Sequence, residues 1–197
     1  MEAVIRFFLF LIGLGCVWLT ASAQAQMPAD EMAFVATVQN AQNQWRAAAD
    51  DIKRAANDIQ REAIDIQRQA MPATRARQLC HTPLAIHNWI GQVKGIGIYT
   101  FLASKDGVLQ GYQAPASLSV LIAPGVTLRT EGDLQNAGSK IERGTELFRS
   151  VSALTIGQAV VFSGHFIREA DCLVETSLTT NGSMTAPAFE FIFSAVR

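Results

Sequence analysis

Three seven-residue blocks follow one another without a gap in the first half of the chain. They read DIKRAAN, DIQREAI and DIQRQAM, and they run from Asp51 to Met71. Each block begins with Asp-Ile and carries Arg in its fourth place and Ala in its sixth. Apolar residues that recur with a period of about 3.5 residues are typical of an α-helix that packs one stripe against a partner. The repeat therefore predicts a long amphipathic helix rather than a sheet or an irregular loop.

The apolar stripe of this helix has a simple composition. In a heptad register, Ala occupies position a, and Ile, Trp or Val occupies position d. Because Ala is small, another backbone can approach this stripe closely. The stripe, called here the helix seam, begins upstream of the repeat and consists of Val38, Trp45, Ala49, Ile52, Ala56, Ile59, Ala63, Ile66 and Ala70.

The charged residues of the repeat predict a second, solvent-facing stripe. Each Arg stands three residues after one Asp, and the first two stand four residues before the next Asp, so opposite charges alternate. Each exposed pair contributes only about 0.2–0.5 kcal/mol to the helix. The spacing thus has a structural explanation and does not indicate paired catalytic carboxylates. The residues concerned are Asp51, Asp58, Asp65, Arg54, Arg61 and Arg68.

The expected helix is long for a chain of 197 residues. Asp30 is an acceptable N-cap, and Pro72 is expected to end the helix after Met71, so we assign the helix to residues 27–72. A helix of that length spans roughly 60 Å, whereas a domain of about 120 residues has a radius of gyration near 14 Å. Three arrangements remain open: self-association through the seam, packing on the chain's own β domain, or an exposed stalk.

The first residues are typical of an export signal. Residues 1–25 contain Arg6, an apolar run from Phe7 to Leu19, and small residues in the Ala-x-Ala pattern that export peptidases cleave. The alternative is an uncleaved anchor over residues 4–23, although the run is shorter than the ~20 apolar residues that span a bilayer comfortably. We expect a periplasmic or secreted protein, attached to a membrane only if this segment is retained.

Two cysteines, Cys80 and Cys172, remain after cleavage of the signal. In an oxidising compartment an even number of cysteines favours a disulfide. Closing a loop of roughly 90 residues stabilises a fold by about 4–5 kcal/mol in the chain-entropy model. We predict this bond, and the alternative is a pair of buried thiols.

The composition changes after Pro72, and residues 79–197 predict a β domain. Apolar and β-branched runs are separated by turn residues such as Asn181-Gly182 and Lys105-Asp106-Gly107. Thr145 is placed to cap one short helix before the fourth strand. The expected strands are Ile86–Leu102, Leu118–Ile122, Val126–Thr130, Gln158–Ile167, Cys172–Thr179 and Ala188–Val196.

Two stretches of this region carry a resemblance to a known fold. Residues 89–93 (WIGQV) open the first strand, and residues 154–164 (LTIGQAVVFSG) follow the helix in an L-x-x-G-x-x-V-x-x-x-G pattern. Residues 84–197 resemble the OB-fold-like domains of exported bacterial proteins of unknown function. The resemblance implies an α+β chain, with the heptad helix followed by a small OB-like antiparallel β-barrel that has one short helix. The extra strand Cys172–Thr179 leaves a β-sandwich open as the alternative.

The residues show no arrangement that carries chemistry. Ser163 and His165 share a strand face but lack a nucleophile elbow, and His81 and His87 do not complete the four-ligand spacing of a zinc site. We assign no catalytic residue, metal or cofactor, and we do not expect an enzyme. The 16 Lys and Arg residues against 17 Asp and Glu residues argue against nucleic acid as the main partner.

The sequence leaves two functions open. The first is a non-enzymatic binding or assembly module of the cell envelope, whose helix self-associates or docks on a protein partner. The alternative is an OB-like domain that binds an oligosaccharide or, against the charge balance, nucleic acid. This alternative needs aromatic side chains on one barrel face, and the candidates are Trp89, Tyr99, Phe101 and Tyr112.

Overall fold

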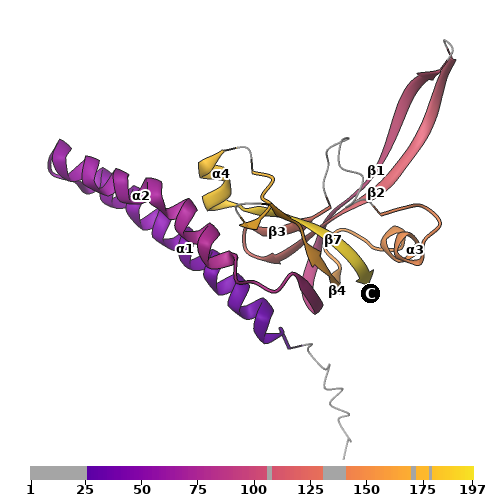
Figure 1. Ribbon diagram of the computed structural model, residues 1–197, viewed down its shortest axis with the longest axis horizontal. Helices are drawn as coiled ribbons and strands as arrows, with labels where there is room; N and C mark the ends of the chain where they lie inside the picture. Colours follow the sequence, from indigo (N-terminus) through magenta and orange to yellow (C-terminus); the bar gives the residue numbers. More distant parts are fainter. Residues whose placement is uncertain (1–25, 106–107, 131–140, 170–171, 178) are drawn as a thin grey trace, which may run out of the picture.

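The computed structural model describes residues 26–105, 108–130, 141–169, 172–177 and 179–197, with residues 98–105 and 108–115 described by their backbone alone. A helical hairpin leads into a small β-barrel, and the tip of the hairpin projects well beyond the barrel (Figure 1). Helix α1 spans Ala29–Arg54 and helix α2 spans Asp58–Leu79. The α+β class predicted from the sequence is confirmed.

The single long helix expected from the repeat is wrong, because the chain breaks between the two helices. Ala55 adopts an extended conformation, and the side chain of Asn57 then caps α2 by accepting a hydrogen bond from the Gln60 N–H at 2.9 Å. Asn is among the best N-capping residues. The break falls where the first block ends in Asn57, whereas the next two blocks end in Ile64 and Met71.

The end of the helical region is also later than predicted. Pro72 lies inside α2, which continues to Leu79. A proline in a helix interior removes one hydrogen bond and costs about 3 kcal/mol or more. Packing beyond the proline offsets this cost, because Arg75 and Leu79 are both buried. Tertiary contacts therefore decide where this helix ends, and the local sequence rule does not.

Five strands form a closed barrel in the order β1-β2-β3-β7-β4, with β4 pairing back to β1. Strand β3 runs parallel to β7, so the barrel is mixed and the all-antiparallel expectation is wrong. The closed barrel is consistent with an OB-like fold, and the sandwich alternative is not observed. The strands are β1 Ala85–Lys105, β2 Val108–Ala123, β3 Val126–Arg129, β4 Ala159–Phe166 and β7 Ala188–Val196.

The first two strands are longer than predicted. The pairing of β1 with β2 continues outward to Lys105 and Val108, so the two strands form an arm that leaves the barrel (Figure 1). The rest of the predicted turn, residues 106–107, lies outside the described residues. The arm lies at the end of the barrel away from the helical hairpin (Figure 1).

The predicted short helix is confirmed, and the strand predicted after β4 is largely wrong. Helix α3 spans Glu146–Ser152, and the Thr145 hydroxyl accepts a hydrogen bond from the Phe148 N–H. In place of one long strand, β6 covers only Cys172–Leu173 and pairs with β5, Arg168–Glu169. The chain then forms helix α4, Thr180–Thr185, because Thr179 supplies an N-cap that accepts from the Gly182 N–H.

The barrel core is aromatic, and α1 closes one side of it. Phe34 of α1 lies 5.5 Å from Trp89 and 5.1 Å from Phe166, measured between ring centroids. Phe166 is part of a row of edge-on contacts with Phe191, which in turn contacts Phe193. Such pairs add about 0.5–1.5 kcal/mol each beyond the burial of their area. The start of the hairpin is therefore part of the barrel core.

Candidate functional site

The two helices expose different parts of the helix seam. Val38 and Trp45 on α1 are 0% and 7% exposed, whereas Ile59 and Ile66 on α2 are 81% and 61% exposed. Ala49 and Ile52, near the end of α1, are partly buried. The three alanines between and beside the α2 isoleucines are also exposed; they are Ala56, Ala63 and Ala70. The α2 half of the seam is thus an apolar stripe without cover from the described residues.

Helix α4 covers Trp45 in the α1 half of the seam, and the barrel core covers Val38. The Trp45 side chain packs with Met184 and donates from Nε1 to the Asn181 side-chain oxygen at 3.2 Å. Gln42, which is also buried, donates to the Thr185 carbonyl at 3.1 Å. The chain therefore packs its own domain on this half, which was one of the three arrangements left open by the sequence.

The opposite face of α2 is turned toward α1 and the barrel. The Arg68 guanidinium lies 3.9 Å from the centroid of the Trp45 ring, a cation–π geometry. Arg75, seven residues later, is 3% exposed. The predicted solvent-facing stripe is therefore wrong at its Arg68 end, but Arg54 and Arg61 are exposed and pair with the Asp three residues before them, as predicted.

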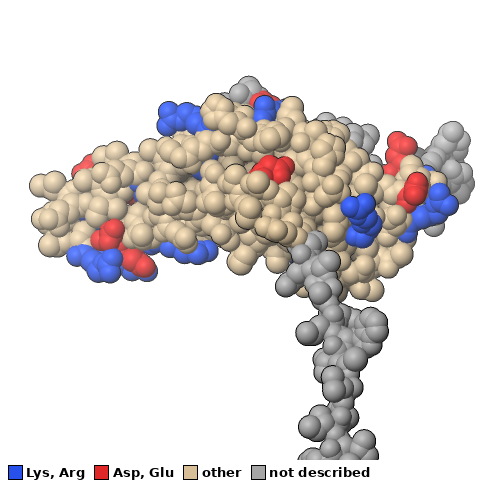
Figure 2. All heavy atoms as spheres, turned by 90° about the horizontal axis from the view of Figure 1, so that it is seen from below, with Lys and Arg blue, Asp and Glu red and all other residues tan. Residues whose placement is uncertain are grey.

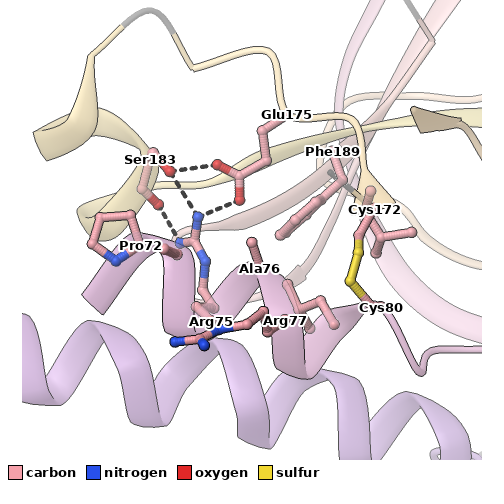
Figure 3. Close-up of a pocket in the computed structure, with 12 residues that line it drawn as sticks. Pro72, Arg75, Ala76, Arg77, Cys80, Cys172, Glu175, Ser183 and Phe189 are labelled. Atoms are coloured by element: carbon pink, nitrogen blue, oxygen red, sulfur yellow. Dashed lines mark hydrogen bonds and ion pairs between the residues drawn. A yellow bond between two sulfur atoms is a disulfide. The ribbon is translucent and has the colours of Figure 1, made fainter. Parts of the chain in front are cut away.

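A buried ion pair attaches the C-terminal part of α2 to the segment that precedes β7. Arg75 donates to both the carbonyl and the hydroxyl oxygen of Ser183, each at 2.7 Å, and forms an ion pair with Glu175 (Figure 3). The Ser183 hydroxyl donates to the other Glu175 oxygen. This network was not predicted. Its one signal in the sequence is that Arg75 extends the seven-residue spacing of arginines beyond the repeat.

The predicted disulfide between Cys80 and Cys172 is present. It joins the end of α2 to β6, across 92 residues of sequence and with the two Cα atoms 4.9 Å apart. A hollow of about 890 Å³ lies between this bond and the Arg75 network, with Leu79 and Leu173 in its wall. Because Arg75 and Glu175 form an ion pair with each other, neither side chain offers a free charge to a ligand in this hollow (Figure 3).

Two carboxylates attach the start of α1 to β1. Asp30 accepts a hydrogen bond from the Trp89 indole N–H, and Glu31 accepts one from the Ile90 N–H, both at 2.9 Å. Glu31 is fully buried, and its second oxygen has no partner among the described residues. Burial raises the pKa of Glu31 from 4.5 to about 7, while the Ile90 hydrogen bond lowers it and nearby Asp30 raises it.

The other residues considered for chemistry do not come together. His81, His87 and His165 are exposed, and no group of three or more His, Cys, Asp or Glu within the described residues could hold a metal ion. Trp89 is 0% exposed in the core, so it is not part of a surface stacking platform. Tyr99, Phe101 and Tyr112 lie in the part of the arm whose side chains are outside the description.

Figure 2 shows how charge is distributed over one face of the molecule. On the face drawn in Figure 2, charged side chains lie in small groups, several of which combine basic and acidic residues, with wide uncharged areas between the groups. No helix among the described residues is both long and apolar enough to cross a membrane. Five large apolar side chains are exposed among the described residues, and two of them, Ile59 and Ile66, lie on the apolar stripe of α2.

Comparisons with known proteins give no relative for this chain. No protein-family model matches it, and neither does any curated protein or solved structure.

Proposed function

We propose that this protein is an exported, non-enzymatic assembly module, in which the helical hairpin joins copies of the chain and the OB-like barrel is the domain that is brought together. The observation that carries the proposal is the exposed stripe of Ile59, Ala63, Ile66 and Ala70 on a hairpin that projects from the barrel. A continuous apolar stripe exposed on one face of a helix supports an interaction surface.

Export is supported by the first residues of the chain, by the disulfide and by a resemblance. Residues 1–25 have the composition of a signal segment. The bond between Cys80 and Cys172 is typical of a periplasmic or secreted protein, because cytosolic thiols are kept reduced. The resemblance of residues 84–197 to domains of exported bacterial proteins points to the same compartment. The assembly would therefore form in the envelope or outside the cell.

The mass of the protein in solution tests the proposal. We expect light scattering on the oxidised protein to give a mass that rises with concentration to that of a dimer. Ala63→Asp places a charge in the stripe and should keep the protein monomeric over the same range. Ala47→Asp is the matched control, because Ala47 is also an exposed helical alanine of the hairpin but lies outside the seam. A wild-type protein that stays monomeric throughout would refute self-association.

A second candidate function is ligand binding by the barrel. It is favoured by the length of the β1–β2 arm, since the connection between these strands takes part in binding oligonucleotides and oligosaccharides in OB-folds. The net charge of -1 favours an oligosaccharide over nucleic acid. Calorimetric titration with neutral oligosaccharides separates the two functions, because this binding would be the same in the wild type and in Ala63→Asp.

A further inference from the structure

The stripe on α2 alternates large and small side chains at regular heptad places. Ile59, Ala63, Ile66 and Ala70 are separated by four, three and four residues. We infer that two copies of the chain pair through this stripe with their α2 helices antiparallel, about a two-fold axis that passes between Ala63 and Ile66. This inference rests on the self-association proposed above and adds the partner's orientation and register to it.

The shape of the stripe favours the antiparallel arrangement. In that register Ile59 lies opposite Ala70 of the partner subunit, and Ala63 lies opposite Ile66 of the partner subunit. Each large side chain then fills the space above a small one, and the two helices approach closely. A parallel pair would instead place Ile on Ile and Ala on Ala, which alternates crowded layers with layers that leave a gap.

The charges at the two ends of the stripe favour the same orientation. Arg77 continues the stripe seven residues after Ala70 and has no ion-pair partner among the described residues. A parallel pair would bring Arg77 against Arg77 of the partner subunit, and like charges that face each other repel. An antiparallel pair separates the two arginines and places each near the start of the other α2 helix. Asp58 at that start is exposed and is already paired with Arg61, so the gain is the separation of the two arginines alone.

The flanks of the stripe are compatible with a two-fold axis. Glu62 borders the stripe on one side, and in the antiparallel register it faces Gln69 of the partner subunit, whose amide can donate to the carboxylate. On the other side, Gln60 faces Gln67 of the partner subunit. No like-charged pair faces itself across this interface.

The pairing is expected to be of modest strength. The stripe from Ile59 to Ala70 is only about 16 Å long, and interfaces below the standard size are typical of weak or transient association. The two barrels would lie at opposite ends of the paired hairpins, because each barrel is attached at one end of its own hairpin (Figure 1).

Disulfide cross-linking between single-cysteine variants tests the orientation. Ile59→Cys and Ala70→Cys are made in a Cys16→Ser background, and a tag on one of them identifies the heterodimer. Each variant is oxidised by itself, and an equal mixture of the two reduced variants is oxidised separately. We expect a covalent heterodimer in the mixture and none from either variant alone. In the antiparallel pair, two copies of position 59 are eleven residues, or about 16 Å, apart along the helices.

A second pair of variants keeps the apolar stripe intact. Glu62→Cys and Gln69→Cys replace only flanking residues and should also cross-link to each other. Ala47→Cys, which lies outside the seam, should not cross-link to any of the four. Each pair is checked for an intact bond between Cys80 and Cys172 by mass spectrometry.

The outcomes distinguish this inference from the function on which it rests. If each variant cross-links to itself and the mixture adds no heterodimer, the helices are parallel and only the orientation is refuted. If light scattering shows a dimer but no variant cross-links, the interface lies elsewhere on the molecule, and this inference is also refuted. A protein that is monomeric at every concentration refutes both.

Discussion

The helix seam lies in two different environments in this molecule. On α1, the seam residues Val38 and Trp45 are buried against the barrel and α4. On α2, Ile59 and Ile66 occupy equivalent heptad places and are mostly exposed. The comparison teaches that a heptad pattern defines which face of a helix is apolar but does not define what covers it.

The difference has a cause in the residues between the two halves. Because Ala55 leaves the helical conformation and Asn57 caps the next helix, the chain reverses, and α2 turns a different face toward α1. The arginines at every seventh position, Arg68 and Arg75, face inward as a result. The apolar side of the same helix is then left outside, so the reversal itself produces the exposed stripe.

The largest expected effect contrasts one apolar residue from each helix. Phe34→Ala removes a ring that contacts Trp89, Phe166 and Phe189 in the core. It should lower the free energy of unfolding by about 3–5 kcal/mol, as for other buried Phe residues. Ile66→Ala should change it by less than about 0.5 kcal/mol at protein concentrations where the chain is monomeric. Urea denaturation measures both, and equal losses would contradict the assignment of α1 to the core.

The next effect contrasts two arginines in the same place of the seven-residue spacing. Arg75→Ala leaves Glu175 largely buried without its partner and should cost about 2–4 kcal/mol of stability. Arg61→Ala removes an exposed pair with Asp58 and should cost less than about 1 kcal/mol. Thermal denaturation compares the two variants. If Arg61→Ala lost as much stability as Arg75→Ala, burial would not decide how much each arginine contributes to stability.

The smallest expected effect depends on pH. Because the pKa of Glu31 is raised from 4.5 to about 7 on folding, the folded chain binds the proton more tightly than the unfolded chain. The contribution of this group to stability is therefore full below pH 4.5 and is lost as the pH rises through about 7. In Glu31→Gln this loss should be absent. Between pH 4.5 and pH 8 the free energy of unfolding of the variant should therefore rise by about 2–3 kcal/mol relative to that of the wild type.

The measurement is the free energy of unfolding from urea titrations at several pH values. Glu62→Gln is the matched control at protein concentrations where the chain is monomeric, since its carboxylate is exposed on α2 and is not part of a buried contact there. A difference between Glu31→Gln and the wild type that stays constant with pH would contradict the burial of a titrating carboxyl at the start of α1.

Much of the fold can be predicted from local pattern, because the strands, the Thr145 cap and the apolar face of the repeat each depend on neighbouring residues. The end of the first block in Asn57 was a visible signal for the break, although the regularity of the repeat outweighed it. By contrast, the contact of Arg75 with Glu175 joins residues 100 positions apart and exists only once α2 is docked. No local pattern predicts such a contact, and none showed which half of the seam the barrel would cover.

The attachment of the hairpin has a mechanical consequence. The hairpin is a beam clamped at one end, with Phe34 set into the barrel core and Cys80 bonded covalently to Cys172. A load applied at the free end, near Asn57, is carried along both helices to these two fixed points and to the Trp45 contact with α4. A partner that bound the tip and pulled on it would therefore turn the barrel as well, so what is bound at one end of the molecule would set the orientation of the other end.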